Sequence, residues 1–154
     1  MGILTEDMKR IVREQRLGFV ATVCADGTPN LSPKGTTGVW DDDHLVFADI
    51  RSPQSVMNIE RNPTVEINVV DPLLRKGYRF KGQGIVHRAD EIFGRACQMY
   101  REAGLTMEIH AVVLIRVDRA LPVISPAYDR GGSEDEVRNR WRRYWRKLWD
   151  GAED

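Results

Sequence analysis

The chain has 154 residues, of which 42% are hydrophobic and 30% charged, and 23 Lys and Arg residues balance 23 Asp and Glu residues. This composition is that of an ordinary globular protein, and the length predicts one domain spanning residues 1–154. The balanced charge provides no net field to attract nucleic acid or an anionic membrane, so we expect neither as a partner.

The sequence also bears on the cellular location. No apolar run is long enough to cross a membrane, and the charged N-terminus lacks the apolar core of a signal peptide. Cys24 and Cys97 lie far apart and show no CxxC spacing. We therefore expect two reduced, buried thiols in a cytoplasmic protein.

The first elements predicted along the chain are a helix and a hairpin. A helix ending near residues 16–18 is indicated by apolar residues at helical spacing, namely Leu4, Met8, Ile11 and Val12. Residues 19–24 are rich in β-branched and aromatic side chains and predict a buried strand. The Asp-Gly pair at 26–27 predicts a hairpin turn, after which residues 30–32 pair back. We expect residues 35–40 to continue this second strand.

Three consecutive acids, Asp41 to Asp43, form the next predicted turn. Three carboxylates could bind a cation, but no spaced acidic or histidine partners follow them. His44, His87 and His110 also lack the spacing of metal ligands. We therefore predict no metal site.

The third strand, residues 45–48, leads into the most informative segment, Arg51-Ser52-Pro53-Gln54-Ser55, which opens a short helix at residues 55–61. Ser52 suits the N-cap, and Pro53 suits the first helical position. The N–H groups of Gln54 and Ser55 would then point outward beside a guanidinium and two hydroxyls, which suits a phosphate monoester. The alternative is an ordinary capped helix whose arginine is solvated.

The second half of the chain adds strands and one helix. Residues 65–69 and 78–84 alternate apolar and polar side chains, residues 90–104 predict a helix capped by Asp90, and 111–117 is the most apolar strand. Together these patterns predict a mainly β (α+β) fold of about six antiparallel strands with peripheral helices. A closed or split barrel accommodates them most simply.

The last predicted helix, residues 133–150, begins with a capping box formed by Ser133 and Glu136. Its amphipathic stripe consists of Val137, Trp141, Tyr144, Trp145 and Leu148. Arginines occupy the other face, so nucleic acid or membrane binding is an alternative. Because nearby acids offset much of this charge, we expect the stripe to pack on the barrel or on a partner subunit.

Five segments in order resemble the flavin-binding split β-barrel family that includes pyridoxamine 5′-phosphate oxidase. The resemblance runs from about Leu17 to Ala120. It rests on Gly18–Val23, Asp26–Pro29, Ser32–Gly35, Arg51–Ser55 leading into Asn58-Ile59 and Asn62-Pro63, and Tyr78–Gly82. It implies an antiparallel split β-barrel that binds FMN at the interface of a homodimer, with residues from both subunits in each site.

The resemblance also implies which positions contact the cofactor. The flavin ring would lie against Ser32, Pro33, Lys34 and Gly35 and against Phe47, Ala48 and Asp49. The phosphate would be held by Arg51, Ser52, Gln54 and Ser55, and Lys81 matches a region that often reaches the flavin. The alternative for Lys34 is a solvated lysine at the end of a strand.

The chain departs from the family in two ways. Many relatives carry a lysine or arginine at the position of Ser55, so we expect a weaker phosphate contact here or one that relies on Arg51. The chain is also shorter than the true oxidases and lacks their C-terminal substrate-binding arginine pattern, so the resemblance does not extend to vitamin B6 oxidation, and the catalytic residues and the small-molecule substrate stay unassigned. Three hypotheses follow. The chain is an FMN-dependent oxidoreductase, a deazaflavin-dependent reductase, or a non-catalytic flavin- or haem-binding protein that serves in storage or sensing.

Overall fold

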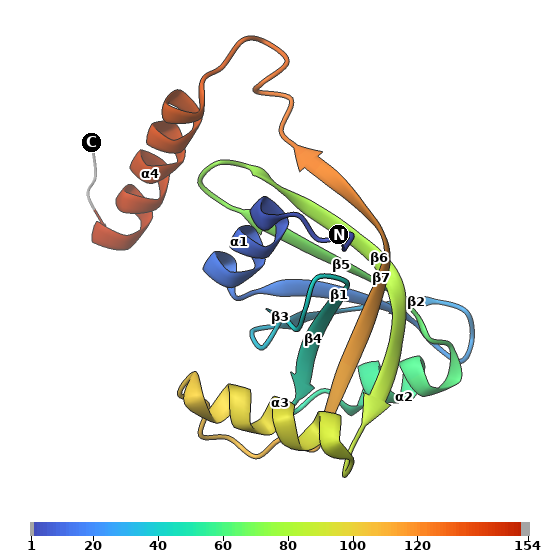
Figure 1. Ribbon diagram of the computed structural model, residues 1–154. Coiled ribbons are helices and arrows are strands. Elements are labelled where there is room, and N and C mark those ends of the chain that lie inside the picture. The colour runs from blue at the N-terminus through green and yellow to red at the C-terminus, as the bar shows by residue number, and fades with distance from the viewer. Residues whose placement is uncertain (1, 152–154) are drawn as a thin grey trace.

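The computed structural model describes residues 2–151, in which a seven-stranded antiparallel sheet curls into a half-open barrel with four helices around it (Figure 1). The strands are β1 (Gly18–Val23), β2 (Pro29–Lys34), β3 (Gly38–Val39), β4 (His44–Asp49), β5 (Thr64–Asp71), β6 (Lys76–His87) and β7 (Ala111–Ile124). The helices are α1 (Glu6–Gln15), α2 (Pro53–Arg61), α3 (Glu91–Glu102) and α4 (Glu134–Asp150). The predicted α+β split barrel is confirmed.

The strands lie in the order β2-β1-β5-β6-β7-β4-β3, so β2 and β3 form the two edges of the sheet. The prediction that residues 35–40 continue the second strand is wrong. The chain turns after Lys34, where the N–H and the hydroxyl of Thr37 both bond to the Lys34 carbonyl. Gly38 and Val39 then pair with β4 at the opposite edge. Residues 35–37 therefore pass from one edge of the sheet to the other.

The core fills the inner face of the curled sheet. Alternate residues of β5 are buried as predicted, with Val65, Ile67 and Val69 at most 2% exposed. They join Phe47 and Phe80 in the largest apolar cluster. Gly82 is required at a bulge in β6, because a Cβ there would lie 2.0 Å from the carbonyl oxygen of Arg116.

Helix α3 covers part of the outer face of the sheet through Ala96 and Tyr100, which pack on Ala48 and Val112. Asp90 caps this helix as predicted, accepting the N–H of Phe93 at 2.9 Å. Both cysteines are free thiols. Cys97 is buried on α3 as predicted, but Cys24 is partly exposed, so the expectation of two buried thiols is wrong for Cys24.

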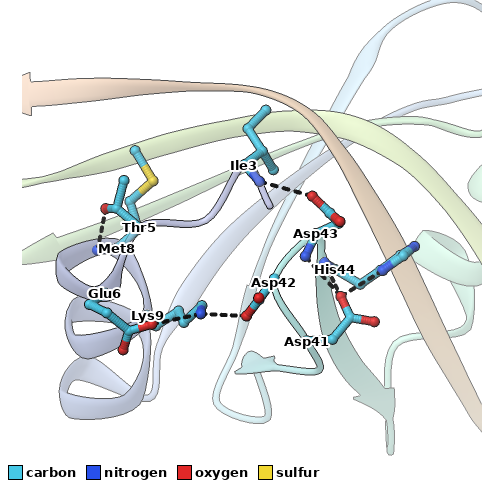
Figure 2. Close-up of polar contacts among 9 residues, drawn as sticks. All are labelled: Ile3, Thr5, Glu6, Met8, Lys9, Asp41, Asp42, Asp43 and His44. Atoms are coloured by element: carbon cyan, nitrogen blue, oxygen red, sulfur yellow. Dashed lines mark hydrogen bonds and ion pairs between the residues drawn. The ribbon is translucent and has the colours of Figure 1, made fainter. Parts of the chain in front are cut away.

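The acidic turn at residues 41–43 anchors the N-terminal segment (Figure 2). Asp42 accepts the amine of the buried Lys9 at 2.5 Å, and Asp43 accepts the N–H of Ile3 at 2.8 Å. Asp41 accepts the N–H of Asp43 at 2.8 Å. Each carboxylate therefore has a structural partner, and among residues 2–151 no group of His, Cys, Asp and Glu side chains forms a potential metal site.

Helix α4 begins with the predicted capping box and extends away from the barrel (Figure 1). Val137 is 4% exposed, and the guanidinium of Arg75 lies 3.4 Å from the ring centroid of Trp141. By contrast, Leu148 is 58% exposed and Trp149 is 76% exposed. The first turns of the stripe are thus covered within one chain, while its cover by a partner subunit stays a prediction. No helix within residues 2–151 is long and apolar enough to span a membrane.

The two ends of the stripe should respond differently to truncation. Val137→Ala removes two buried methyl groups and should lower the free energy of unfolding by about 1–3 kcal/mol. Leu148→Ala, at an exposed position, should change it by less than about 0.5 kcal/mol. Chemical denaturation of both variants measures these values. Equal losses would contradict the exposed end of α4 and would indicate that a second subunit covers Leu148.

Candidate functional site

Lys34, at the end of β2, is buried rather than solvated, with 4% of its surface exposed. Its amine donates to the hydroxyl of Ser32 at 2.9 Å and lies 5.6 Å from the ring centroid of Phe47. Burial lowers the pKa of the Lys34 amine, and the nearby negative charge of Asp49 opposes this shift. The sheet edge therefore holds a cation in surroundings that solvate it poorly.

The Thr36 hydroxyl holds the loop at residues 35–37 against β4. The Thr36 hydroxyl donates to the carbonyl of Ala48 at 3.1 Å and accepts the N–H of Ala48 at 3.0 Å. From α3, the buried Tyr100 hydroxyl donates to the Thr36 carbonyl at 2.8 Å, and burial raises the pKa of Tyr100. These bonds bring the end of β2 against the end of β4, which places Lys34 beside Asp49.

Gly35 leaves open space beside this fastened loop. A Cβ at position 35 would have one neighbour within 4 Å, the carbonyl oxygen of Arg16 at 3.9 Å. Packing in the described part of the chain therefore does not require glycine here. An open, exposed backbone next to a buried amine suits the approach of a flat ligand.

Asp49 organises the start of α2. It is 6% exposed, and its carboxylate accepts the N–H of Ser52 at 2.7 Å. Ser52 occupies the predicted N-cap position, but its side chain makes no capping hydrogen bond. Because Asp49 already holds the backbone at Ser52, the helix start is ordered without that bond.

Of the two N–H groups predicted to be free at the start of α2, that of Ser55 is already bonded. The N–H of Ser55 donates to the carbonyl of Ser52 at 3.2 Å, and the Ser55 side chain is 1% exposed. Among residues 2–151, the N–H of Gln54 has no partner, and the exposed Arg51 guanidinium has no ion pair. The available anion donors are therefore Arg51, the Ser52 hydroxyl and one backbone N–H.

A buried amide network missed by the sequence analysis ties α2 to the sheet. The side chain of Gln54 donates to Asn58 at 2.8 Å, and the fully buried Asn58 donates to the hydroxyl of Thr22 at 3.0 Å. Asn30 on β2 donates to the same hydroxyl at 3.2 Å. The sequence could have indicated Asn58, because it is a polar residue on the apolar face of the helix and such a residue needs a hydrogen-bond partner.

Other predicted contacts lie elsewhere in the single chain. Phe47 and Ala48 are 0% and 3% exposed, with side chains in two separate core clusters. Pro33 lies exposed on β2. Lys81 projects from the outer face of β6 and pairs with Glu66 at 3.1 Å, so the structure does not bring it to the Lys34–Asp49 pair. Its contact with a flavin stays a prediction.

Comparisons with known proteins agree with this architecture. A family model described as pyridoxamine 5′-phosphate oxidase matches residues 4–123. HupZ of Group A Streptococcus is 32% identical, with a TM-score of 0.71 over 79% of this chain and 94% of that chain. No curated protein matches the sequence.

More distant solved structures share the fold alone. An FMN-binding protein of Syntrophomonas wolfei is 15% identical, with a TM-score of 0.67 over 79% of this chain and 87% of that chain. An F420 reductase is 20% identical, with a TM-score of 0.60 over 76% of this chain and 98% of that chain.

The burial of Lys34 predicts a pH-dependent stability. Its folded-state pKa lies below the ordinary value of 10.5, so the charged amine destabilises the ligand-free fold at neutral pH. This penalty fades as the pH rises through the folded-state pKa towards 10.5. Lys34→Met should therefore melt above the wild type at pH 7, with a gap that narrows by pH 10.

Thermal melts at both pH values test this, with Lys81→Met, at an exposed lysine, as the control for general effects of pH. If Lys34→Met melts below the wild type at pH 7, or if the difference between the two melting temperatures widens as the pH rises, burial does not destabilise the charged Lys34 amine.

Proposed function

The chain belongs to the pyridoxamine 5′-phosphate oxidase family, and we propose that it binds FMN at the junction of β2, β4 and α2 and acts as a small FMN-dependent oxidoreductase. The observation that carries this proposal is a buried amine at the end of β2, followed by an open glycine and lying near Asp49, whose carboxylate holds the start of α2 next to the exposed Arg51.

The residues at the start of α2 fit a phosphate monoester. Arg51 supplies an exposed guanidinium, Ser52 a hydroxyl without a capping bond, and Gln54 a backbone N–H at a helix N-terminus. A helix N-terminus and an arginine are the groups that phosphate prefers in proteins. Because the N–H of Ser55 is already bonded, Arg51 would contribute most of the phosphate binding.

The residues at the end of β2 fit a planar ring. Gly35 leaves room for close approach of a ring to the backbone, and the Lys34 amine would stabilise negative charge on it. FMN, when bound, supplies a ring that accepts electrons or a hydride and returns them. The chain contributes the orientation, through Thr36 and Asp49, and a poorly solvated cation that favours the reduced, anionic ring.

Deazaflavin and haem are the alternatives to FMN. The structural similarity to an F420 reductase is at 20% identity and supports a shared fold only. The absorption spectrum of the protein loaded with each compound separates the candidates. Bound FMN gives a yellow flavin spectrum, a deazaflavin gives a single band at shorter wavelength, and haem gives a Soret band. Turnover with NAD(P)H then distinguishes an enzyme from a carrier.

The phosphate grip predicts discrimination between FMN and riboflavin. One hydrogen bond to a charged group contributes about 1.5–3 kcal/mol, so Arg51→Ala should weaken FMN binding about 10- to 150-fold. The same change should leave riboflavin binding nearly unaltered, because riboflavin carries no phosphate. Fluorescence-quenching titrations measure both affinities.

The matched control is Arg61→Ala, which removes an exposed arginine from the opposite end of α2 and should leave both affinities unchanged. Equal binding of FMN and riboflavin to the wild type would remove the phosphate assignment and leave the Arg51 segment as a plain helix start.

A homodimer with the flavin at its interface is part of the proposal. Support comes from the outer face of β1 and β2, where Phe19 and Leu31 are 44% and 66% exposed. Apolar groups at this exposure suit a partner surface. A partner subunit would also bring a second set of side chains to the open junction.

Sedimentation at micromolar concentration should show a species of twice the 17.6 kDa chain mass. Leu31→Glu, which places a charge on the proposed interface, should shift this equilibrium to monomer by tenfold or more, about 1.4 kcal/mol. The control is Ile124→Glu, at another exposed apolar position on the distal end of β7. A 17.6 kDa species that still holds flavin would overturn the dimer.

A further inference from the structure

A cavity of about 390 Å³ lies between the end of α1, the loop at residues 35–37 with strand β3, and the end of α3. Its volume suits one small organic molecule. The wall includes Val12, Val39, Met99 and Leu105, which provide an apolar surface. The cavity is separate from the outer-face residues Phe19 and Leu31 that we assign to the dimer.

Two arginines lie beside this apolar surface. Arg13 and Arg16 line the cavity, both are exposed, and neither forms an ion pair with any residue in the range 2–151. Arg10, one turn earlier on the same helix, bonds to both Asp7 and Glu14. The cavity lining contains no aspartate or glutamate. Its charge is therefore positive and uncompensated.

The helix dipole alone does not account for this arrangement. Basic residues in the last turn of a helix stabilise it by about 0.3–1 kcal/mol, and that role needs no cavity. Arg16 has a φ of 51° at the C-cap of α1, a left-handed conformation in which glycine or asparagine is less strained than arginine. The end of the helix therefore gives no reason for an arginine at position 16.

The cavity adjoins the proposed flavin site. Gly35 and Thr36 line it, and Thr36 is the residue whose hydroxyl is bonded to Ala48. Lys34 immediately precedes this loop and lies at the proposed ring position. Gly35, against which we propose that the ring lies, also lines the cavity, so a molecule in the cavity would lie next to the ring.

We propose that this cavity binds a small organic anion with an apolar body, such as an aromatic or branched aliphatic carboxylate, and that it is the substrate subsite of the protein. The apolar wall takes the body and the two guanidiniums take the carboxylate. A ligand with a free amine would meet two cations and no carboxylate among the lining residues. The assignment as a substrate subsite rests on the proposed flavin function, whereas the anion binding does not.

The probe is 4-bromobenzoate, with 4-bromobenzamide as its uncharged counterpart. Amide proton–nitrogen correlation spectra of the flavin-free protein report binding through Gly35, Gly38 and Gly104, which line the cavity. Bromobenzoate should shift these three signals, and the amide should bind at least about tenfold more weakly, since one charged hydrogen bond contributes 1.5 kcal/mol or more.

Variants of the two arginines test the site directly. Arg13→Gln and Arg16→Asn should each weaken bromobenzoate about tenfold. Asparagine tolerates the left-handed backbone at position 16, so the fold is expected to persist. Arg10→Gln is the matched control on the same helix and should leave the affinity unchanged. Equal binding of acid and amide, unaltered affinity in both variants, or shifts confined to other residues would overturn the anion cavity.

A final titration in the presence of FMN separates this inference from the proposed function. If both hold, bromobenzoate perturbs the visible flavin spectrum of the wild type and not that of the Arg13→Gln, Arg16→Asn double variant. An unperturbed spectrum with bromobenzoate bound overturns the substrate subsite but leaves the flavin proposal standing. Failure to bind FMN, with arginine-dependent binding of bromobenzoate retained, overturns the flavin proposal and the subsite role together and leaves the anion cavity standing.

Discussion

The site depends on how the two edges of one curled sheet are joined. The order of the strands leaves β2 and β3 unpaired on their outer sides, and residues 35–37 connect them. The Thr36 hydroxyl fixes this connection by satisfying both backbone groups of Ala48, and Tyr100 secures it from α3. A single threonine side chain thus satisfies backbone groups of β4 that a neighbouring strand would satisfy in a closed barrel.

This junction buries two side chains of opposite charge close to each other. Lys34 and Asp49 are both at most 6% exposed, and they lie together because β2 and β4 end at the same place. Their burial is costly in a protein without a ligand, since neither charge is fully solvated. An anionic, planar cofactor would compensate the amine, which is the physical reason for assigning flavin binding to this junction. The cavity beside Gly35 then becomes the natural position for a second molecule.

The sequence predicted those features that depend on local patterns. Alternation in residues 65–69, the Asp90 cap and the capping box at Ser133 were all found, because period and capping are properties of neighbouring residues. The position of β3 was not predictable in this way, since both edges of the sheet accept a two-residue strand. The burial of Lys34 and the occupied N–H of Ser55 also depend on contacts across the fold. Nothing in the sequence singled out Arg13 and Arg16, because part of the cavity that they line comes from the end of α3, more than eighty residues along the chain.

At this junction, we propose, a flavin ring lies against Gly35. The FMN affinity of Gly35→Leu tests this, because a Cβ at position 35 would have one neighbour within 4 Å in the ligand-free protein, the Arg16 carbonyl oxygen at 3.9 Å. The ligand-free Gly35→Leu variant should melt at the temperature of the wild type, and it should bind FMN about tenfold or more weakly, the effect of a clash of about 1–3 kcal/mol. An unchanged FMN affinity in a folded Gly35→Leu variant would contradict this position of the ring.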